Sequence, residues 1–468
     1  MTCNIKKYGI GTLLLLAIAI LVYGCKDFTD VAAPSNQLST ETVYTNDATL
    51  NSAIAGMYST MANDNAQIIQ TNLSALTSMC ADDMTYPTGN DYDGFVNNSI
   101  PINDTNVADM WAAFYSSIYQ ANSIIYGVQN STQGALSDSI KQNATAEAKF
   151  VRAFCYFYLT NLWGDVPLAL TTDAKVNNSL TRSSQSAVYT QIIKDLVDAK
   201  NILRKDYFFS SSNRTRVNKY GAMALLSRVY LYNKDWKNAE SYADSVIEKN
   251  TIYNLLDPSE MSGIFVQNNQ EAIWQLSSSS TTEYTSEGSY FQLVNGEIPY
   301  YALTDDLIKN FNTGDNRLTN WIGTKDADGT TWHYPLKYKQ NANSSGATEY
   351  VTYLRLAEQY LIRAEARNNQ ENTNGAVLDL DVIRNRAGLG NFNSSANQQA
   401  IDLEIEKECR LEFFAEYGHR WFDLKRRDRA DSVLGAQKSG WKSSDALWPI
   451  PSTEITNNHN LTQNSGYK

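Results

Sequence analysis

The sequence predicts a mainly α-helical protein with a few short strands, built on helical hairpins. Apolar residues recur at three- and four-residue spacing along most of the chain. Leu226, Ser227, Tyr230 and Ala239 have the offsets of a tetratricopeptide repeat, with small residues where paired helices must approach closely. Two long segments rich in Asn, Ser, Thr, Gly and Asp interrupt the helical pattern and predict a loop-rich, irregular face.

The expected helices follow one another along the chain. The segment Thr45-Asn-Asp can cap the first, whose apolar positions include Leu50 and Ile54. Further helices are expected over residues 110–125, 147–163, 187–203, 221–248 (as a pair), 353–368, 375–386 and 401–417, and short strands over 271–277 and 335–339. The segment 147–163 is apolar nearly all round, so we expect a buried central helix that ends at Gly164.

The N-terminal segment has the pattern of an exported lipoprotein. Lys6 and Lys7 precede the apolar run TLLLLAIAILVYGC, residues 12–25, in which Gly24 supplies the small residue before a lipidated Cys25. A transmembrane anchor is the less favoured alternative, because spanning a bilayer takes roughly 20 apolar residues. The expected product is an exported bacterial protein that is held at a membrane by its lipid.

The expected organisation follows from this signal. It comprises a signal peptide (1–24), a lipidated tether (25–44) and a helical domain (45–468) with loop-rich insertions at about 79–106 and 256–348. Asp27 and Asp30 behind the lipid resemble an acidic surface-export tag, although an ordinary linker would look the same.

Composition and charge exclude several classes of protein. The chain has 468 residues, 43% of them hydrophobic and 19% charged, which is enough for one large domain or two to three average ones. Its net charge of −11 argues against nucleic acid and against an electrostatic hold on anionic lipid. Cys80, Cys155 and Cys409 are widely spaced and do not favour a disulfide or metal site, and Cys155 and Cys409 are expected to be buried free thiols. No cofactor is expected, and a structural calcium ion has no support: in Asp326-Ala-Asp-Gly329 the glycine comes too early for an EF-hand, so a tight turn is favoured.

No catalytic constellation stands out. The three histidines, His333, His419 and His459, are far apart, and no nucleophile elbow, P-loop or metalloprotease motif occurs. Asp82 and Asp83 form an adjacent carboxylate pair of the residue type that hydrolyses glycosides, but neighbouring side chains normally point in different directions.

The segment 404–427 concentrates charge and aromatic residues. Glu404, Glu408, Glu412 and Glu416 form a stripe that repels itself unless arginines face it. The candidate arginines on neighbouring helices are Arg355, Arg363, Arg367, Arg384 and Arg386. We therefore favour an ion-pair lattice between helices over a catalytic role for Glu416, His419 and Asp423.

Binding is the function that the two irregular segments favour. Aromatic rings bury the apolar face of a sugar, while amides and carboxylates satisfy its hydroxyl groups. The candidate ligand-binding residues are Asp82, Asp83, Tyr86, Asn90, Tyr92, Tyr284, Tyr290, Tyr300, Trp321 and Trp332. Packing within the loops is the alternative for each aromatic residue.

The chain resembles the SusD/RagB family of outer-membrane nutrient-binding lipoproteins over essentially its whole mature length. Seven stretches carry the resemblance in order: TLNSAIAGMYSTM, AEAKFVRAFCYFYLTNLWGDVPL, TRSSQSAVYTQIIKDLVDA, RVNKYGAMALLSRVYLYNKDWKNAESYADSVI, YLRLAEQYLIRAEARN with LDVIRNRAG, IEKECRLEFFAEYGHRWFDLKR and LWPIPSTEITNNHNLTQNSGY. Ser465 stands where relatives more often have proline.

The resemblance implies a single domain with a loop-rich ligand face, a glycan ligand and a SusC-like TonB-dependent porin as partner. It also implies binding without cleavage, and a protein that covers the porin like a lid. Three alternatives remain open: the same scaffold binding peptides, a glycoside hydrolase that uses Asp82 or Asp83, and an adaptor whose helices bind a protein. The matching stretches belong to the scaffold, so they transfer no binding residue.

Overall fold

The computed structural model describes residues 40–65, 67–132, 134–277, 284–293, 298–341, 343–344, 346 and 348–467. The predicted signal peptide, Cys25, Asp27 and Asp30 lie outside the described residues. The first described helix, α2 (Thr40–Val43), begins inside the segment expected as tether. Tyr44 then packs on a later helix and donates a hydrogen bond to the Ser123 carbonyl at 2.7 Å, so the described fold already includes the last residues of that segment.

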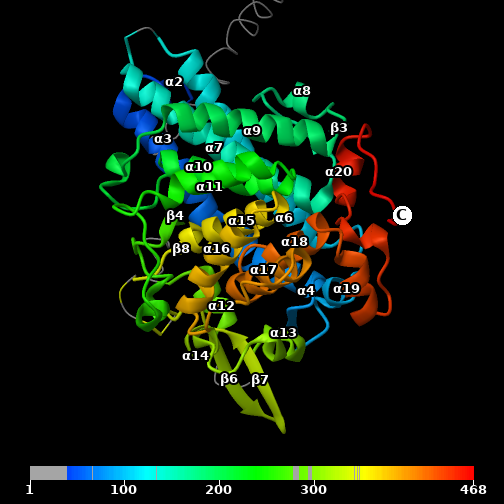
Figure 1. The fold of residues 1–468 in the computed structure, drawn as a ribbon. Helices are drawn as coiled ribbons and strands as arrows, with labels where there is room; N and C mark the ends of the chain where they lie inside the picture. The colour runs from blue at the N-terminus through cyan, green and yellow to red at the C-terminus, as the bar shows by residue number, and fades with distance from the viewer. Residues whose placement is uncertain are drawn as a thin grey trace, which may run out of the picture.

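Long helices stacked as hairpins make up most of the molecule (Figure 1). They are α3 (Asp47–Ser59), α6 (Thr105–Gln129), α7 (Asp138–Trp163), α9 (Gln185–Ile202), α10 (Lys219–Tyr232), α11 (Trp236–Ile247), α15 (Leu356–Asn369), α16 (Thr373–Arg386) and α17 (Gln398–Phe413). Shorter helices are α4 (Leu73–Cys80), α5 (Asp93–Val96), α8 (Ala174–Asn177), α12 (Ser286–Phe291), α13 (Asp305–Asn310), α14 (Asn316–Trp321), α18 (His419–Arg426), α19 (Ala430–Gln437) and α20 (Ser452–Asn457). Single turns of other helix types fill out the connections: Thr60–Asp64 and Gln67–Asn72 are π-helical, and Phe208–Ser210, Pro258–Gly263 and Ser443–Ala446 are 3₁₀. The predicted mainly α fold is confirmed.

Local chemistry sets where these helices begin and end. The Asn46 side chain accepts a hydrogen bond from the Thr49 amide and caps α3, as expected. The central helix α7 is buried almost all round along its second half, and it ends at Gly164, which takes a positive φ of 74°. The helix starts at Asp138, nine residues before the predicted 147, because the turns before Glu147 are more polar than a fully buried helix and escaped the apolar pattern.

The repeat-like contacts lie where the small residues predicted them. Ala239 is fully buried, and it packs with Leu231 and Ala366 between α10, α11 and α15. Ser227 donates a hydrogen bond to Gln359 Oε1 at 2.6 Å, which joins α10 to α15 directly. Small side chains at these positions let the helices approach closely enough to share one core.

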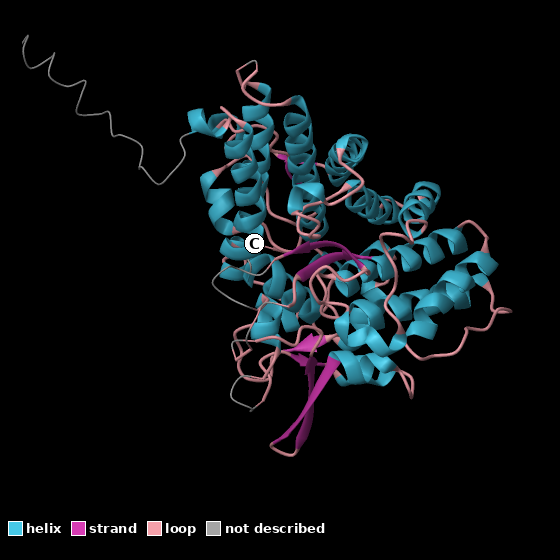
Figure 2. Ribbon diagram, turned by 90° about the vertical axis from the view of Figure 1, so that its left-hand side faces the viewer, coloured by secondary structure: helices cyan, strands magenta, loops and turns pink. Residues whose placement is uncertain are grey.

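Three small sheets join the irregular segments to the helices. The largest has the strand order β1 (Met84–Thr85), β5 (Ala302–Leu303), β7 (Thr330–Pro335), β6 (Ile322–Ala327). The others pair β2 (Val166–Pro167) with β3 (Arg182–Ser183), and β4 (Ala272–Leu276) with β8 (Val351–Arg355). Figure 2 shows the β6–β7 hairpin projecting from the base of the helical body. Its turn falls at Asp328 and Gly329, both with positive φ, so the predicted tight turn is confirmed.

Two segments differ from the expected elements. Residues 336–339 are not a strand, since β7 ends at Pro335. The helix expected over 401–417 stops at Phe413, because Ala415, Tyr417 and Gly418 all take positive φ values that interrupt a helix.

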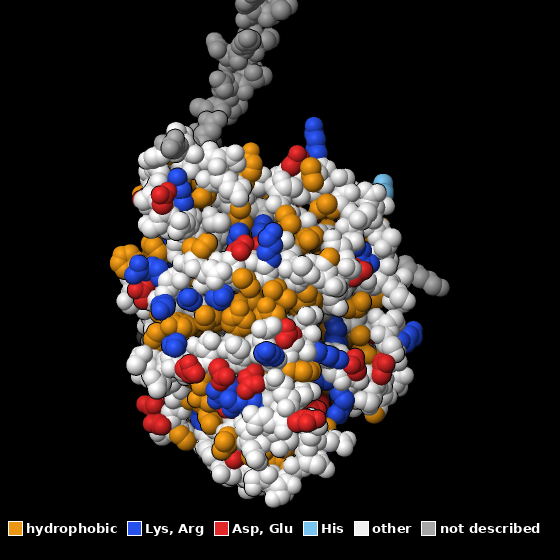
Figure 3. Space-filling view, turned by 45° about the horizontal axis from the view of Figure 1, so that its top comes forward, with side chains coloured by type: hydrophobic (Ala, Val, Ile, Leu, Met, Phe, Trp, Pro, Cys, Tyr) orange, Lys and Arg blue, Asp and Glu red, His pale blue; other side chains and the backbone are white. Residues whose placement is uncertain are grey.

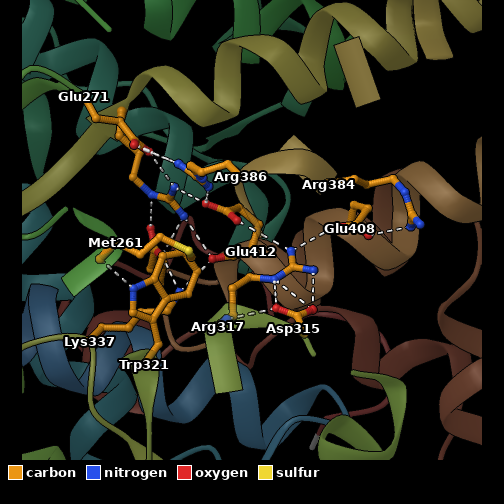
Figure 4. Close-up of polar contacts among 12 residues, drawn as sticks. Met261, Glu271, Asp315, Arg317, Trp321, Lys337, Arg384, Arg386, Glu408 and Glu412 are labelled. Atoms are coloured by element: carbon orange, nitrogen blue, oxygen red, sulfur yellow. Dashed lines mark hydrogen bonds and ion pairs between the residues drawn. The ribbon is translucent and has the colours of Figure 1, made fainter. Parts of the chain in front are cut away.

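A buried lattice of ion pairs holds these helices to the strands (Figure 4). At its centre Glu412 on α17 binds Arg355, the last residue of β8, and Arg386 on α16. Glu271, next to β4, binds the same two arginines at 3.2 and 2.7 Å. Burial alone would raise the pKa of Glu412, but Arg386, Arg355 and Arg317 outweigh it and hold the pKa well below its usual range.

The lattice extends along α17 in both directions. Glu408 binds Arg317 at 2.8 Å and Arg384 at 3.1 Å, and Arg317 also binds Asp315 at 2.7 Å. Glu416 binds Arg355 at 2.9 Å and also Lys337, whose pKa burial lowers to about 8. The predicted lattice is therefore confirmed for Arg355, Arg384 and Arg386, whereas Arg363 and Arg367 pair with Asp379 instead.

Pairing extends to the rim of the helical layer. Arg363 also binds Asp244 and Arg367 binds Glu240, both on α11. Figure 3 shows positive and negative side chains lying next to one another below a band of hydrophobic side chains. Many charges of this acidic chain are thus paired within the molecule.

The first prediction concerns Glu412. We expect Glu412→Gln to lower the free energy of unfolding by about 3–5 kcal/mol, because it removes the buried carboxylate that Arg355 and Arg386 share and leaves the remaining acids too few to balance the buried arginines. The matched control is Glu404→Gln, since Glu404 pairs with Arg384 at the lattice edge and should cost at most about 1 kcal/mol. Urea unfolding followed by circular dichroism measures both, and equal losses for the two variants would contradict the central role of Glu412.

Candidate functional site

Strand pairing brings tyrosines from two distant segments together. The β1–β5 register pairs Met84 with Leu303 and Thr85 with Ala302, so the next residues along, Tyr86 and Tyr301, lie opposite one another. Their ring centroids are 5.7 Å apart. Tyr86 also lies 4.7 Å from Tyr92, edge to face, and 6.4 Å from Tyr300, whose ring is within 17° of parallel. We call Tyr86, Tyr92, Tyr300 and Tyr301 the tyrosine platform.

The members of the platform differ in exposure. Tyr300 is 40% exposed, Tyr86 and Tyr92 are half-buried, and Tyr301 is buried beneath them. Burial raises the pKa of Tyr301, and the neighbouring hydroxyl groups of Tyr92 and Tyr86 raise it further. The result is a neutral aromatic floor with open rings above it.

Polar groups surround the platform. Asn90 and Asp91 are exposed on the loop that carries Tyr86, and the ring of Tyr86 lies against Gly89. On the α12 side Tyr290 donates a hydrogen bond to Gln67 Oε1 at 3.0 Å. A hollow of about 540 Å³ borders the same strand, lined by side chains that include Thr85, Asn97, Ser99, Thr304, Asp306 and Lys438.

The carboxylate groups of Asp82 and Asp83 are not exposed at this surface, although Asp82 borders the hollow. Both are buried, and Arg420 binds both carboxylate oxygens of Asp82 at 2.8 and 2.9 Å. Arg410 binds Asp83 at 2.7 Å and Asp82 at 3.1 Å. The prediction that these two carboxylates contact a ligand is therefore wrong for this structure, because buried charges are satisfied by buried arginines.

The acidic pair instead fixes the strand that carries the platform. The carbonyl oxygens of Asp82 and Asp83 accept hydrogen bonds from the Thr304 hydroxyl and amide at 2.7 and 3.0 Å. Thr304 directly follows β5, so the two platform segments are clamped together one residue beyond their paired strands. Arg410 and Arg420 tie this clamp to α17 and α18.

The tryptophans lie apart from the platform. Trp321 is fully buried and donates a hydrogen bond to the Met261 carbonyl at 3.1 Å, so its prediction as a ligand contact is wrong. Trp332 is half-buried on β7, opposite Lys325, and Tyr284 is half-buried just before α12. Among the described residues, the ring contacts of the platform include none of these three.

The structure thus brings together three of the predicted aromatic residues, Tyr86, Tyr92 and Tyr300, with Tyr290 alongside. Sequence reasoning missed Tyr301, the buried floor. The only feature of the sequence that marked Tyr301 was its position directly before a short apolar pair, Ala302 and Leu303. The strand with which this pair aligns could not be predicted from the sequence.

A buried carboxyl group lies behind α12. Glu287 accepts a hydrogen bond from the Tyr417 hydroxyl at 2.9 Å, while its other oxygen, Oε2, has no hydrogen-bond partner. Burial raises the pKa of Glu287 to about 7. Because Glu287 lies on the same short helix as Tyr290, its protonation bears on the stability of one wall of the site.

Glu416, His419 and Asp423, the residues of the catalytic alternative, make structural contacts within the fold. Glu416 binds Arg355, and Asp423 binds Arg426 at 2.6 Å. His419 is half-buried and stacks on the Phe413 ring at 4.4 Å, and desolvation together with nearby arginine and lysine charges holds its pKa well below the usual value. These contacts support the ion-pair interpretation.

Within the described part of the chain, no group of three or more His, Cys, Asp and Glu residues is arranged to hold a metal ion. In that same part, no helix combines the length and apolarity required to cross a bilayer.

Comparison with protein families covers both halves of the chain. A family model described as "Starch-binding associating with outer membrane" (SusD-like) matches residues 27–231, and the model of the SusD family (SusD/RagB) matches residues 330–467. The chain belongs to the SusD/RagB family. Family membership confirms the resemblance carried by the seven sequence stretches.

Individual SusD-like proteins align over most of the chain. A SusD-like protein of Bacteroides ovatus is 28% identical over 93% of this chain and 86% of its own. The starch-binding protein SusD of Bacteroides thetaiotaomicron is 24% identical over 72% of this chain and 75% of its own.

Solved structures share the fold. A SusD superfamily protein from Bacteroides vulgatus superposes with a TM-score of 0.79 at 20% identity, over 91% of this chain and all of that one. A laminarin-binding SusD-like protein superposes with a TM-score of 0.75 at 24% identity, with the same coverage. These matches confirm a single SusD-like helical domain.

A second prediction tests the clamp beneath the platform. We expect Asp82→Asn to lower the free energy of unfolding by about 3 kcal/mol, because Arg420 and Arg410 lose a buried counter-charge. Asp91→Asn, on the exposed tip of the same loop, should change it by less than about 0.5 kcal/mol. Thermal unfolding monitored by circular dichroism compares the two. An unchanged unfolding transition in the Asp82→Asn protein would mean that the clamp does not hold the loop.

A third prediction concerns pH. Glu287 has a folded-state pKa of about 7, above the ordinary 4.5, so the folded protein keeps a proton there that the unfolded chain releases. The contribution to stability is therefore full below pH 4.5 and is lost as the pH rises to 7, by roughly 3 kcal/mol in all. Replacement by glutamine in Glu287→Gln should remove this loss. Denaturant unfolding of the wild type and the variant at several pH values gives the difference, which should grow from pH 4.5 to 7; a constant difference would contradict the raised pKa.

Proposed function

We propose that this protein captures a glycan at the cell surface without cleaving it and delivers it to a SusC-like TonB-dependent transporter in the outer membrane. The lipid on Cys25 would hold the protein beside that transporter, facing outward. The observation that carries the proposal is the tyrosine platform, in which the nearly parallel rings of Tyr86 and Tyr300 sit over a buried aromatic floor.

The chemistry of the platform suits a sugar. A pyranose ring has an apolar face of C–H groups and a rim of hydroxyl groups, so it can lie on Tyr86 and Tyr300 while polar neighbours meet its edge. Asn90, Asp91 and the hollow beside β1 supply such neighbours. Family relatives named for starch and laminarin binding support the same ligand class.

The scaffold supports binding in preference to turnover. A glycosidase needs two carboxyl groups flanking the bond that it cleaves. The adjacent pair Asp82 and Asp83 is committed to Arg410 and Arg420 beneath the loop. A platform whose rings and clamp are already in place pays little ordering cost on binding, which favours capture and release.

The fourth prediction tests the platform. In the mature, non-lipidated chain, Tyr86→Ala combined with Tyr300→Ala should weaken binding of laminarin or starch about fivefold to thirtyfold, since removal of two stacking faces costs roughly 1–2 kcal/mol in all. Calorimetry with oligosaccharides and affinity electrophoresis on the polymers provide the measurement.

The matched control is Phe208→Ala, which removes an aromatic ring that is 65% exposed on another part of the surface. Loss of sugar binding in the control as well would point to a general effect of surface change. Binding of peptides but of no glycan would replace the proposal with the peptide-binding alternative, and release of reducing ends would replace it with hydrolysis.

A further inference from the structure

Helix α6 carries two exposed tyrosines that no scaffold contact accounts for. Tyr119 is 54% exposed and Tyr126 is 56% exposed, and Tyr300 of the platform is the only other tyrosine in the described part of the chain that is counted as exposed. Residues seven apart lie on the same face of a helix, separated by about 10 Å along its axis. That distance matches the length of a disaccharide unit.

The surface around these rings is hollowed. One hollow of about 530 Å³ lies between α6, α8 and α20, and a second of about 550 Å³ lies along α6 toward Tyr44. Both are lined by Tyr119, so they adjoin at that side chain. We call the two together the α6 groove.

The walls of the α6 groove are fixed by packing. On one side the rings of Trp111 and Tyr115 lie 5.0 Å apart, and the Tyr115 hydroxyl donates a hydrogen bond to the Pro167 carbonyl at 2.8 Å. On the other side the Tyr44 ring occupies the space that a side chain at Gly127 would need, within 2.1 Å of the position of its Cβ. Rigid aromatic walls of this kind preserve the shape of a binding surface without ligand.

Uncommitted polar groups line the first hollow. Asn177 Oδ1 is buried and has no hydrogen-bond partner, although its amide donates to the Thr171 carbonyl at 2.8 Å. Within the described residues, the side chains of Asn178 and Asn457 make no hydrogen bond. A buried amide oxygen without a partner is costly, so a ligand hydroxyl that donates to it would remove that cost.

The α6 groove is almost uncharged. Glu454 is the only charged residue that lines either hollow, among the residues that the structure describes. Burial raises the pKa of Glu454, and a hydrogen bond from Trp111 partly opposes the shift. A neutral lining of rings and amides disfavours peptides of high charge, nucleic acid and phosphate, and it suits a neutral ligand rich in hydroxyl groups.

We propose that the α6 groove is a second carbohydrate-binding site, which takes a short neutral oligosaccharide segment across Tyr119 and Tyr126. Figure 1 shows α8 and α20 above α12 and α13, and no residue that lines the groove belongs to the tyrosine platform. The second site shares the ligand class of the proposed function but not its residues, and each site can bind without the other.

Two sites on one protein change how a long chain is held. A polysaccharide that meets one site is presented to the other at a high local concentration, so the polymer binds more tightly than an oligosaccharide does. A short oligosaccharide would fill the two sites independently. The number of short oligosaccharides bound per protein, and the gain in affinity from oligosaccharide to polymer, therefore distinguish a protein with two sites from a protein with one.

The experiment uses the mature, non-lipidated full chain with laminarihexaose and maltohexaose in calorimetry, and with laminarin and starch in affinity electrophoresis. The groove variant is Tyr119→Ala with Tyr126→Ala; both side chains are exposed, so its unfolding transition should match the wild type. The platform variant is Tyr86→Ala with Tyr300→Ala, and Phe208→Ala is the control for loss of an exposed ring.

We expect the wild type to bind two equivalents of the preferred hexasaccharide, and each double variant to bind one. The groove variant should also lose about tenfold in affinity for the polymer, equal to about 1.4 kcal/mol. A wild type that binds one equivalent, with the platform variant binding none, would overturn the second site and leave the proposed function intact. A wild type that binds neither sugar in either form would overturn both. A groove variant with unchanged sugar binding that no longer co-purifies with the transporter would make this face a protein interface and overturn the inference.

Discussion

The buried pairing of Arg355 with Glu412 is the contact on which the rest of the structure depends. Arg355 ends β8, Glu412 lies in the middle of α17, and Arg386 and Glu271 add α16 and the start of β4 to the same point. Burying so many charges gains little net stability, because desolvation offsets much of the attraction. What such a lattice does impose is geometry, since any other arrangement of these elements would leave a buried charge unpaired. The orientation of the repeat-like helices against the strands follows from that condition.

Helix α17 transmits this constraint to the ligand face. Glu408 and Glu412 face the lattice, while Arg410, between them in sequence, faces the opposite way and binds Asp83. Arg420 on α18 completes the clamp through Asp82. The segment that carries Tyr86, directly after β1, is therefore fixed by ion pairs to α17 and α18, and the exposed rings rest on this buried support. A surface that is already ordered before binding loses little binding free energy to the ordering of its own side chains.

Features that depend on local sequence patterns could be predicted from the sequence. Features that depend on strand register or on burial could not. The helices and their caps, the buried thiols and the glutamate stripe with facing arginines could be read from spacing alone. Arg363 and Arg367 were assigned to the wrong partner because their choice of Asp379 depends on how α15 rotates against α16. Asp82 and Trp321 have the residue types of a sugar site, yet both are buried, and a single sequence does not show depth. Tyr301 was missed beside Tyr300 because only the pairing of β1 with β5 decides which ring becomes the floor.

The division of charge within the chain bears on the kind of ligand that it suits. Buried arginines and acids satisfy one another in the lattice, beneath the platform and along α11, α15 and α16, so that much of the charge is committed within the fold. The surfaces left over at the platform and in the α6 groove are rings, hydroxyl groups and amides with very few charges. Contacts of this kind are individually weak and short-ranged, since they lack the Coulomb attraction that holds an ion. A surface made of them can hold a neutral polymer through several contacts and still release each unit, which is the behaviour that the proposed capture and delivery requires.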